Sequence, residues 1–349
     1  MTTSPPSPRP SRVPRAVALA AATVLAGVAL TACGSDDDAG GTATGGPRIV
    51  ASTTVYADIA EQVAGGNASV ESVISDPAAD PHSYEASPAD AAAVTAADLV
   101  VYNGGGYDAF VDRALGNADS VPVVRAVDDF ARVTGETAPE YAHEEDEGDD
   151  RGDATGHDDH DGHDHASGTN EHVWFSLPTA AAVAERIAEE LAAIDGENAA
   201  DYRDNAREFA EALAPLEAEL DAIHDRGHFS YVQTERIGAH LFDAAHMVDL
   251  TPAGFLASIE DDTDPSAADL SATLDLIAGQ QASFLAFNTQ TETPVTARVR
   301  AAAEDADLVV VDLSETLPED SDYLSWMTGI VDSLSAALDG ATPAADGGH

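Results

Sequence analysis

The sequence predicts an α/β fold of two lobes, each with a mostly parallel sheet flanked by helices, joined by one long rigid helix. Short β-branched apolar runs alternate with Ala-rich helical segments, the runs fall into two groups, and a long amphipathic stretch separates the groups. Strands that alternate with helices form parallel sheets covered on both faces. The expected strands lie at 48–53, 70–75, 99–102 and 121–124 in the first group, and at 229–232, 283–287 and 308–311 in the second.

The stretch between the two groups has helical periodicity throughout. From Leu177 to Ile194 the apolar residues recur every three or four positions, which predicts one face of an amphipathic helix. A second series runs from Tyr202 to Ile223 with spacings of 4, 3, 4, 3, 4 and 3. It covers about six turns at 3.6 residues per turn, and Pro215 marks the place for a kink. We expect this helix to act as a stiff spine between the lobes.

The N-terminus has the pattern of an export signal. Three arginines precede an apolar run, 16–30, that ends in Leu-Thr-Ala-Cys33. The run is shorter than the roughly 20 residues of a membrane-spanning helix. Its end resembles a bacterial lipobox, so we expect a lipoprotein signal peptide at 1–32, lipidation of Cys33 and a flexible tether over 33–46. Cys33 is the single cysteine, which rules out an intrachain disulfide and a cysteine-based metal site.

The composition is strongly acidic. The formal net charge is −49, and all 15 basic residues are arginine. A surface of this kind repels nucleic acid and attracts cations, which makes nucleic acid an unsuitable partner. A proteome that favours Asp, Glu, Ala and Arg would give the same bias, so the charge alone is weak support for metal binding.

The segment 140–170 is rich in histidine and acidic residues. Between Glu140 and Glu171 there are five histidines and thirteen acidic residues, with hardly any apolar side chain. Such a segment cannot bury enough surface to offset its ordering entropy, so we expect it to be disordered without metal. Mixed His/Asp tracts are typical of metal capture, and imidazole suits zinc. The expected auxiliary ligands, of low affinity, are His143, His157, His160, His163 and His165.

Four motifs follow one another along the mature part of the chain. The first is Asp80-Pro-His-Ser-Tyr-Glu85, followed by Ala97-Asp-Leu-Val-Val-Tyr-Asn-Gly104. The second, directly after the His-rich segment, is Glu171-His-Val-Trp-Phe-Ser176. The others are Thr234-Glu235 with Leu250-Thr-Pro-Ala-Gly-Phe255, and Phe287-Asn-Thr-Gln-Thr-Glu-Thr-Pro294 with Glu315-Thr-Leu-Pro318. In this order the motifs resemble those of the zinc/manganese ABC-transporter substrate-binding proteins, the cluster A-I family. The matches extend over nearly the whole mature chain, from Ile49 to about Leu338.

The resemblance implies a metal site between the two lobes. By motif position its ligands are His82, His172, Glu235 and Glu292, with His240, Asn288 and Gln290 as alternatives at the last two positions. Two neutral imidazoles and two carboxylates give a neutral site for a divalent ion, compatible with zinc, manganese or iron. The His-rich segment favours zinc, whereas a Glu at position 235 is typical of manganese carriers. We expect zinc, with manganese as the alternative.

The implied function is that of a monomeric, lipid-anchored binding protein on the extracellular face of the cytoplasmic membrane, which passes its ion to an ABC transporter permease. A metal chaperone or a surface adhesin on the same fold is the alternative. A zinc hydrolase is less well supported, because the sequence has neither H-E-x-x-H nor G-x-S-x-G, and we expect no enzyme. The expected division is 47–195 for the first lobe, 196–225 for the linking helix, 226–340 for the second lobe and 341–349 for a disordered tail.

Overall fold

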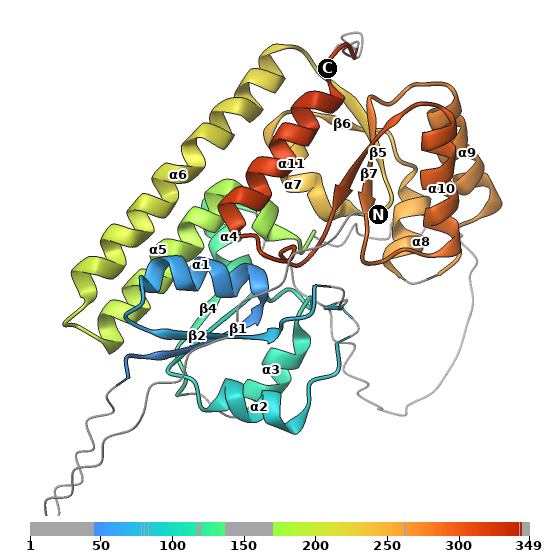
Figure 1. Ribbon diagram of the computed structural model, residues 1–349. Helices are drawn as coiled ribbons and strands as arrows, with labels where there is room; N and C mark the ends of the chain where they lie inside the picture. The colour runs from blue at the N-terminus through green and yellow to red at the C-terminus, as the bar shows by residue number, and fades with distance from the viewer. Residues whose placement is uncertain are drawn as a thin grey trace, which may run out of the picture. The chain divides into compact units, whose positions relative to one another are not determined.

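Two parallel sheets of four strands form the framework of the protein (Figure 1). The computed structural model describes residues 45–341 and 343, except 78, 80, 83, 117–119, 137–169 and 262. The strand order is β2-β1-β3-β4 in the first sheet and β6-β5-β7-β8 in the second. The strands are β1 Arg48–Thr53, β2 Ser69–Ile74, β3 Leu99–Tyr102, β4 Val123–Arg125, β5 Ser230–Gln233, β6 Val248–Asp249, β7 Phe284–Asn288 and β8 Val309–Leu313.

Helices cover both faces of each sheet, which confirms the predicted α/β class. The first sheet has α2 and α3 on one side, and the second has α8, α9 and α10 on its own outer side (Figure 1). The helices are α1 Thr54–Ala64, α2 Pro88–Thr95, α3 Ala109–Leu115, α4 Ala126–Thr134, α5 Leu177–Ile194, α6 Ala199–Asp225, α7 Ala239–Ala244, α8 Ala253–Glu260, α9 Ala267–Ala278, α10 Pro294–Asp305 and α11 Tyr323–Ala337. Short 3₁₀ turns lie at Val173–Phe175 and Arg236–Gly238.

The core is made of three apolar clusters, one of which is shared by both sheets. The central strands β1, β3, β5 and β7 are buried almost throughout, as expected for parallel strands covered on both faces. Alternate residues of each strand point to opposite faces. On the outer faces, Val50 and Val100 pack with α2 and α3, and Leu285 and Phe287 pack with α8 to α10. The inner faces contribute to a single cluster that contains Val101 of β3, Phe284 of β7 and residues of α5, α6 and α11.

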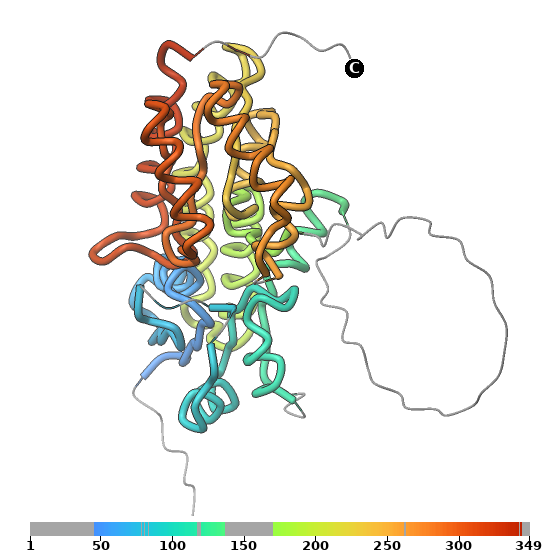
Figure 2. The backbone as a smooth tube through the Cα atoms, turned by 90° about the vertical axis from the view of Figure 1, so that its right-hand side faces the viewer, coloured from blue at the N-terminus to red at the C-terminus, as the bar shows by residue number. Residues whose placement is uncertain are grey.

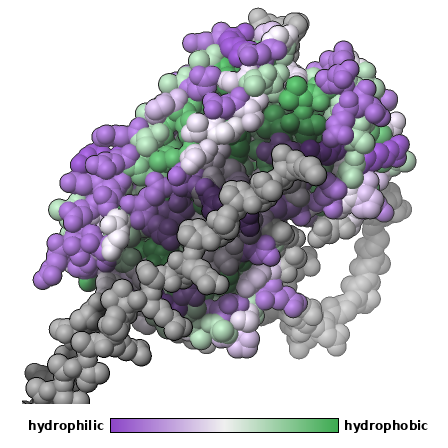
Figure 3. All heavy atoms as spheres, in the orientation of Figure 1, coloured by the Kyte–Doolittle hydropathy of each residue, from purple (hydrophilic) through white to green (hydrophobic). Residues whose placement is uncertain are grey.

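The helix α6 is the predicted spine. Its 27 residues run alongside elements of both sheets in two views at right angles (Figures 1 and 2), and at 1.5 Å per residue it is about 40 Å long. The periodic series seen in the sequence is its buried face, whereas the side that faces outward is largely hydrophilic (Figure 3). Pro215 lies inside the helix at an exposed position, where water can satisfy the carbonyl that proline leaves unbonded. The buried residues are Tyr202, Ala206, Phe209, Leu213, Leu216, Leu220 and Ile223.

Several predictions concern residues outside those described here. They are the export signal, Cys33, the tether up to residue 44, the five histidines of the segment 140–170 and most of the tail, 344–349. Among the helices formed by the described residues, none is long and apolar enough to cross a membrane. The proposed boundaries of the lobes and of the linking segment stay predictions.

Candidate metal centre

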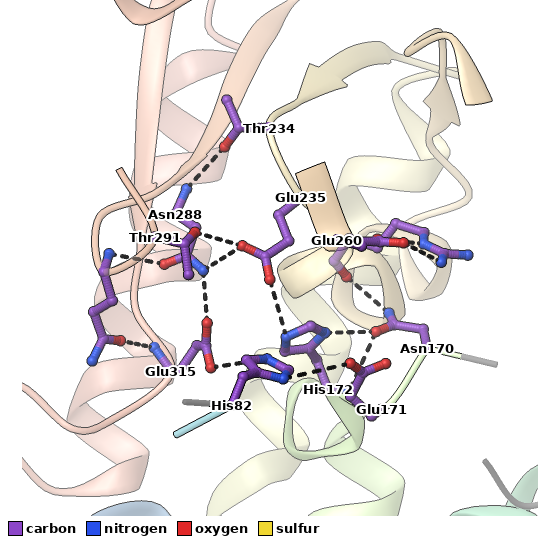
Figure 4. Close-up of polar contacts among 12 residues, drawn as sticks. His82, Asn170, Glu171, His172, Thr234, Glu235, Glu260, Asn288, Thr291 and Glu315 are labelled. Carbon is purple, nitrogen blue, oxygen red and sulfur yellow. Dashed lines mark hydrogen bonds and ion pairs between the residues drawn. The ribbon is translucent and has the colours of Figure 1, made fainter. Parts of the chain in front are cut away.

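Four side chains from distant parts of the sequence meet between the two sheets (Figure 4). His82 lies in the loop after β2, His172 directly before the 3₁₀ turn at 173–175, and Glu235 directly after the Gln233 end of β5 and Thr234. Glu315 lies two residues beyond β8. One nitrogen or carboxylate oxygen of each residue lies within 4.8 Å of the others. Three of the four therefore follow the carboxyl ends of parallel strands, where α/β sheets usually bind ligands.

The fourth member of this cluster differs from the sequence-based prediction. Glu292 is exposed in the turn before α10, and it does not belong to the cluster that the described residues form. Glu315 takes its place, and its side chain is fully buried. Glu292 lies four residues beyond the end of β7, whereas Glu315 lies two residues beyond the end of β8. In the sequence Glu315 follows the predicted strand 308–311 by four residues and Glu292 follows 283–287 by five, so this spacing hardly separates the two.

The alternatives for the last two positions have other roles. His240 packs against Phe130, and its Nε2 lies 3.0 Å from the carbonyl oxygen of Asn170. Asn288 donates hydrogen bonds to the carboxylates of Glu235 and Glu315. The Gln290 amide donates to the carbonyls of Pro77 and Ala79, in the loop that leads to His82. Among the described residues these three support the cluster without belonging to it.

The ring of His172 is held with one nitrogen towards the centre of the cluster. Its Nδ1 lies 2.7 Å from Asn170 Oδ1, an oxygen that can only accept, so Nδ1 carries the proton. The opposite nitrogen, Nε2, is buried, has no hydrogen-bond partner among the described residues and lies 3.8 Å from Glu235 Oε1. Burial, with a smaller contribution from His82, lowers the pKa of His172 well below its usual value. The imidazole is therefore neutral near pH 7, the form that binds metal ions.

His82 closes the cluster on the side nearer to solvent. Its side chain is 32% exposed, whereas that of His172 is 3% exposed. The Nε2 atom of His82 lies 3.4 Å from Glu315 Oε2, and its Nδ1 lies 4.0 Å from Glu171 Oε1. Both separations exceed the usual 2.7–3.2 Å or so of an N–H···O hydrogen bond. Of these two carboxylates only Glu315 belongs to the cluster of four, so His82 and Glu315 are the pair that could share an ion.

The carboxylates of Glu235 and Glu315 are buried, and the cluster that the described residues form contains no lysine or arginine. Burial raises the pKa of Glu235, and hydrogen bonds from Thr291 and Asn288 and the nearby His82 oppose that effect. Two buried carboxylates at close range are costly, because burial in a low-dielectric interior disfavours charge and like charges repel. A divalent cation would offset both costs.

Aromatic side chains fix the positions of the two imidazoles. The Tyr107 ring lies edge-on to His82 with centroids 4.9 Å apart, and Trp174 lies edge-on to His172 at 5.2 Å. A sharp turn over 104–106 brings Tyr107 to this place. All three glycines of the turn have positive φ, and a Cβ on Gly104 would lie 2.4 Å from Arg125 Nε. Only glycine fits there at low cost.

The turn is also held by a buried carboxylate. Asp108 accepts hydrogen bonds from the backbone N–H groups of Asn103 at 2.7 Å and Gly104 at 2.8 Å. The Asn103 amide in turn donates to the carbonyl of Glu171 at 2.8 Å, next to His172. Burial raises the pKa of Asp108 to about 6 in spite of these bonds. The start of the turn and the segment that carries His172 are thus joined by a direct hydrogen bond.

A pair of parallel sheets with a candidate site between them is the architecture of a two-lobed α/β protein. A comparison with known protein families identifies the family. Residues 49–337 match the model of the family described as zinc-uptake complex component A, periplasmic. The chain belongs to this family. The curated relatives named below are substrate-binding or metal-binding proteins.

Curated relatives match about half of the chain. The manganese ABC transporter substrate-binding lipoprotein scaA of Streptococcus gordonii is 27% identical over 200 residues, which are 56% of this chain and 57% of that protein. The manganese-binding lipoprotein MntA of Bacillus subtilis is 27% identical over 57% of this chain and 56% of its own length. The iron-binding protein YfeA of Yersinia pestis is 29% identical over 50% of this chain and 47% of its own length. The matched region thus spans only about half the length of these relatives.

Solved structures share the fold over a larger part of the chain. The periplasmic zinc-binding protein TroA of Treponema pallidum has a TM-score of 0.64 and 18% identity, and covers 84% of this chain and 99% of its own. The manganese complex of FpvC from Pseudomonas aeruginosa has a TM-score of 0.63 and 20% identity, and covers 85% of this chain and 100% of its own. At this level of identity the likeness concerns the fold alone.

Proposed function

We propose that the protein is the extracytoplasmic binding component of a metal ABC transporter, which captures one divalent ion between its lobes and delivers it to a membrane permease. The proposed ligands are His82, His172, Glu235 and Glu315. The observation that carries the proposal is the convergence of their donor atoms within 4.8 Å, in a site where three of the four residues are buried. Family membership and the metals named for the relatives support the same function.

Zinc is the proposed ion, and manganese is the alternative. The site offers two nitrogen and two carboxylate ligands, a set that suits four-coordinate zinc. The relatives differ among themselves, since their names specify manganese, iron or zinc. The His-rich segment supports zinc, because imidazole is a poor ligand for a hard ion such as manganese.

The first test counts the bound ions. We expect the full chain to bind one zinc ion tightly and further ions weakly, the latter through the histidines of the segment 140–170. Replacing His143, His157, His160, His163 and His165 with Gln should reduce the total number of zinc ions bound and leave the tight one, because none of the proposed ligands lies in that segment. Equilibrium dialysis of both proteins measures this difference. Loss of the tight ion in the variant would show that one of these histidines is a primary ligand and would contradict the proposed site.

The proposed lipid anchor has a separate test. We expect Cys33→Ala to release the protein from the membrane or to prevent its processing, because Cys33 is the only residue that can carry the lipid. Fractionation of cells followed by mass determination of the mature chain measures both effects. The soluble variant should bind zinc with unchanged affinity. A membrane-bound, correctly processed Cys33→Ala protein would rule out the anchor while leaving the metal site untouched.

A further inference from the structure

Asn288 lies between the two carboxylates of the candidate site and contacts both of them (Figure 4). Its single side-chain nitrogen donates to Glu235 Oε2 at 2.7 Å and to Glu315 Oε1 at 2.8 Å. The side chain is buried, at the end of β7 between the strands that precede the two glutamates. An amide nitrogen has two hydrogens, so each carboxylate receives one.

The orientation of the Asn288 amide is fixed by a hydrogen bond to its oxygen. Its oxygen accepts a hydrogen bond from the backbone N–H of Gln290 at 3.0 Å, so the nitrogen must face the glutamates. The backbone N–H of Asn288 donates to Thr234 Oγ1 at 3.2 Å, next to Glu235 in the chain. With both ends of the amide engaged, rotation would leave a buried donor or acceptor unsatisfied, which costs about 1–3 kcal/mol.

The contacts divide the oxygens of each carboxylate into two kinds. Glu235 Oε2 accepts from Asn288 and also from Thr291 Oγ1 at 2.7 Å, whereas Oε1 faces His172. Glu315 Oε1 accepts from Asn288, whereas Oε2 faces His82 at 3.4 Å. Each glutamate therefore presents one oxygen towards the imidazoles and holds the other in a hydrogen bond on the far side.

The number of oxygens presented bears on the choice of ion. Two imidazole nitrogens and two single carboxylate oxygens make four donor atoms, the number that zinc takes in tetrahedral sites. Manganese is a harder ion that favours six-coordinate, oxygen-rich sites. A pair of glutamates free to turn could bind it with both oxygens, whereas turning a glutamate held by Asn288 so that both oxygens face the ion would stretch or break these hydrogen bonds.

We propose that Asn288 is a positioning residue that selects zinc over manganese by holding each glutamate to a single coordinating oxygen. The proposal rests on the proposed metal site and adds to it a determinant of ion choice outside the ligand set. Thr291 acts in the same direction on Glu235 alone, so its removal should have a smaller effect.

The test compares Asn288→Ala and Thr291→Val in the full chain that carries Gln at the five histidines of the segment 140–170. Competition titrations give the affinities for zinc and for manganese, and the visible spectrum of bound Co²⁺ reports the coordination number, since four-coordinate Co²⁺ absorbs far more strongly than six-coordinate Co²⁺. Asn205→Ala is the matched control, because Asn205 donates a hydrogen bond to the carbonyl of Val63 on α1 and takes no part in the site.

In Asn288→Ala we expect the ratio of zinc to manganese affinity to fall by about tenfold or more, within the 10–100-fold typical of residues that support ligands. The Co²⁺ band should weaken, and Thr291→Val should show a smaller shift. An unchanged ratio and spectrum, or an equal loss for both ions, would overturn the proposal and leave Asn288 with a purely structural role. Failure of the metal site itself would look different, because the parent protein would then bind neither ion tightly.

Discussion

Replacing His172 with alanine is expected to abolish tight metal binding and to leave a folded protein. The imidazole supplies a neutral, buried nitrogen that is already directed into the cluster by Asn170. Without it, three of the proposed ligands remain, and a more weakly bound ion would offset less of the repulsion between the two buried carboxylates. His82→Ala should have the same effect with less damage to packing, because its side chain is 32% exposed.

The measurement combines competition titration with thermal unfolding in the presence and absence of zinc. An ion that binds only the folded state stabilises it by about 2.7 kcal/mol at a free concentration of 100 times the dissociation constant. That stabilisation should vanish in both variants, whereas unfolding without metal should change little for His82→Ala. His228→Ala is the control, since its ring contacts His224 and the carbonyl of His246, outside the cluster. Wild-type affinity in both His82→Ala and His172→Ala would refute the assignment of the site.

The second large effect separates the two candidates for the fourth ligand. Glu315→Gln keeps the shape of the side chain and an oxygen that can accept from Asn288, but it removes the negative charge at the ion. We expect zinc affinity to fall by more than the roughly 10–100-fold seen when only a supporting residue is lost. Glu292→Gln should leave affinity unchanged, because Glu292 is exposed and outside the cluster.

The same titration measures both variants, and their comparison needs no other control, since the chemical change is identical. The reverse result, a large loss in Glu292→Gln and none in Glu315→Gln, would mean that the segment after β7 rearranges to bring Glu292 to the ion. Losses in both would require a site that closes around five ligands.

Much of the fold could be predicted because its signals are local. The strand β1 lies at the predicted residues, since a short β-branched run that is apolar on both faces is typical of a buried parallel strand. The series from Tyr202 to Ile223 is the buried face of α6, residue for residue. The strand β6 was missed because it has only two residues, both exposed, and leaves no hydrophobic pattern.

The site was accessible to sequence reasoning only in part. Motifs in the chain placed His82, His172 and Glu235 near one another, and the structure brings them together. The prediction of the fourth residue was wrong because a glutamate follows each of two strands, β7 and β8. Only the geometry of the strand ends distinguishes Glu315 from Glu292. The role of Asn288 depends on contacts with residues 53 and 27 positions away, which no local pattern encodes.

The apolar cluster shared by the inner faces of both sheets limits how far the lobes can separate to release the proposed ion. A wide swing of one lobe away from the other would separate side chains of this cluster and expose apolar surface to water. Each 100 Å² so exposed costs about 2.5 kcal/mol. Thermal fluctuation alone would then open the protein rarely, and an ion held by four converging ligands would leave slowly. Delivery on a physiological time scale would require a receiving partner that opens the site on the side of His82, whose side chain is 32% exposed.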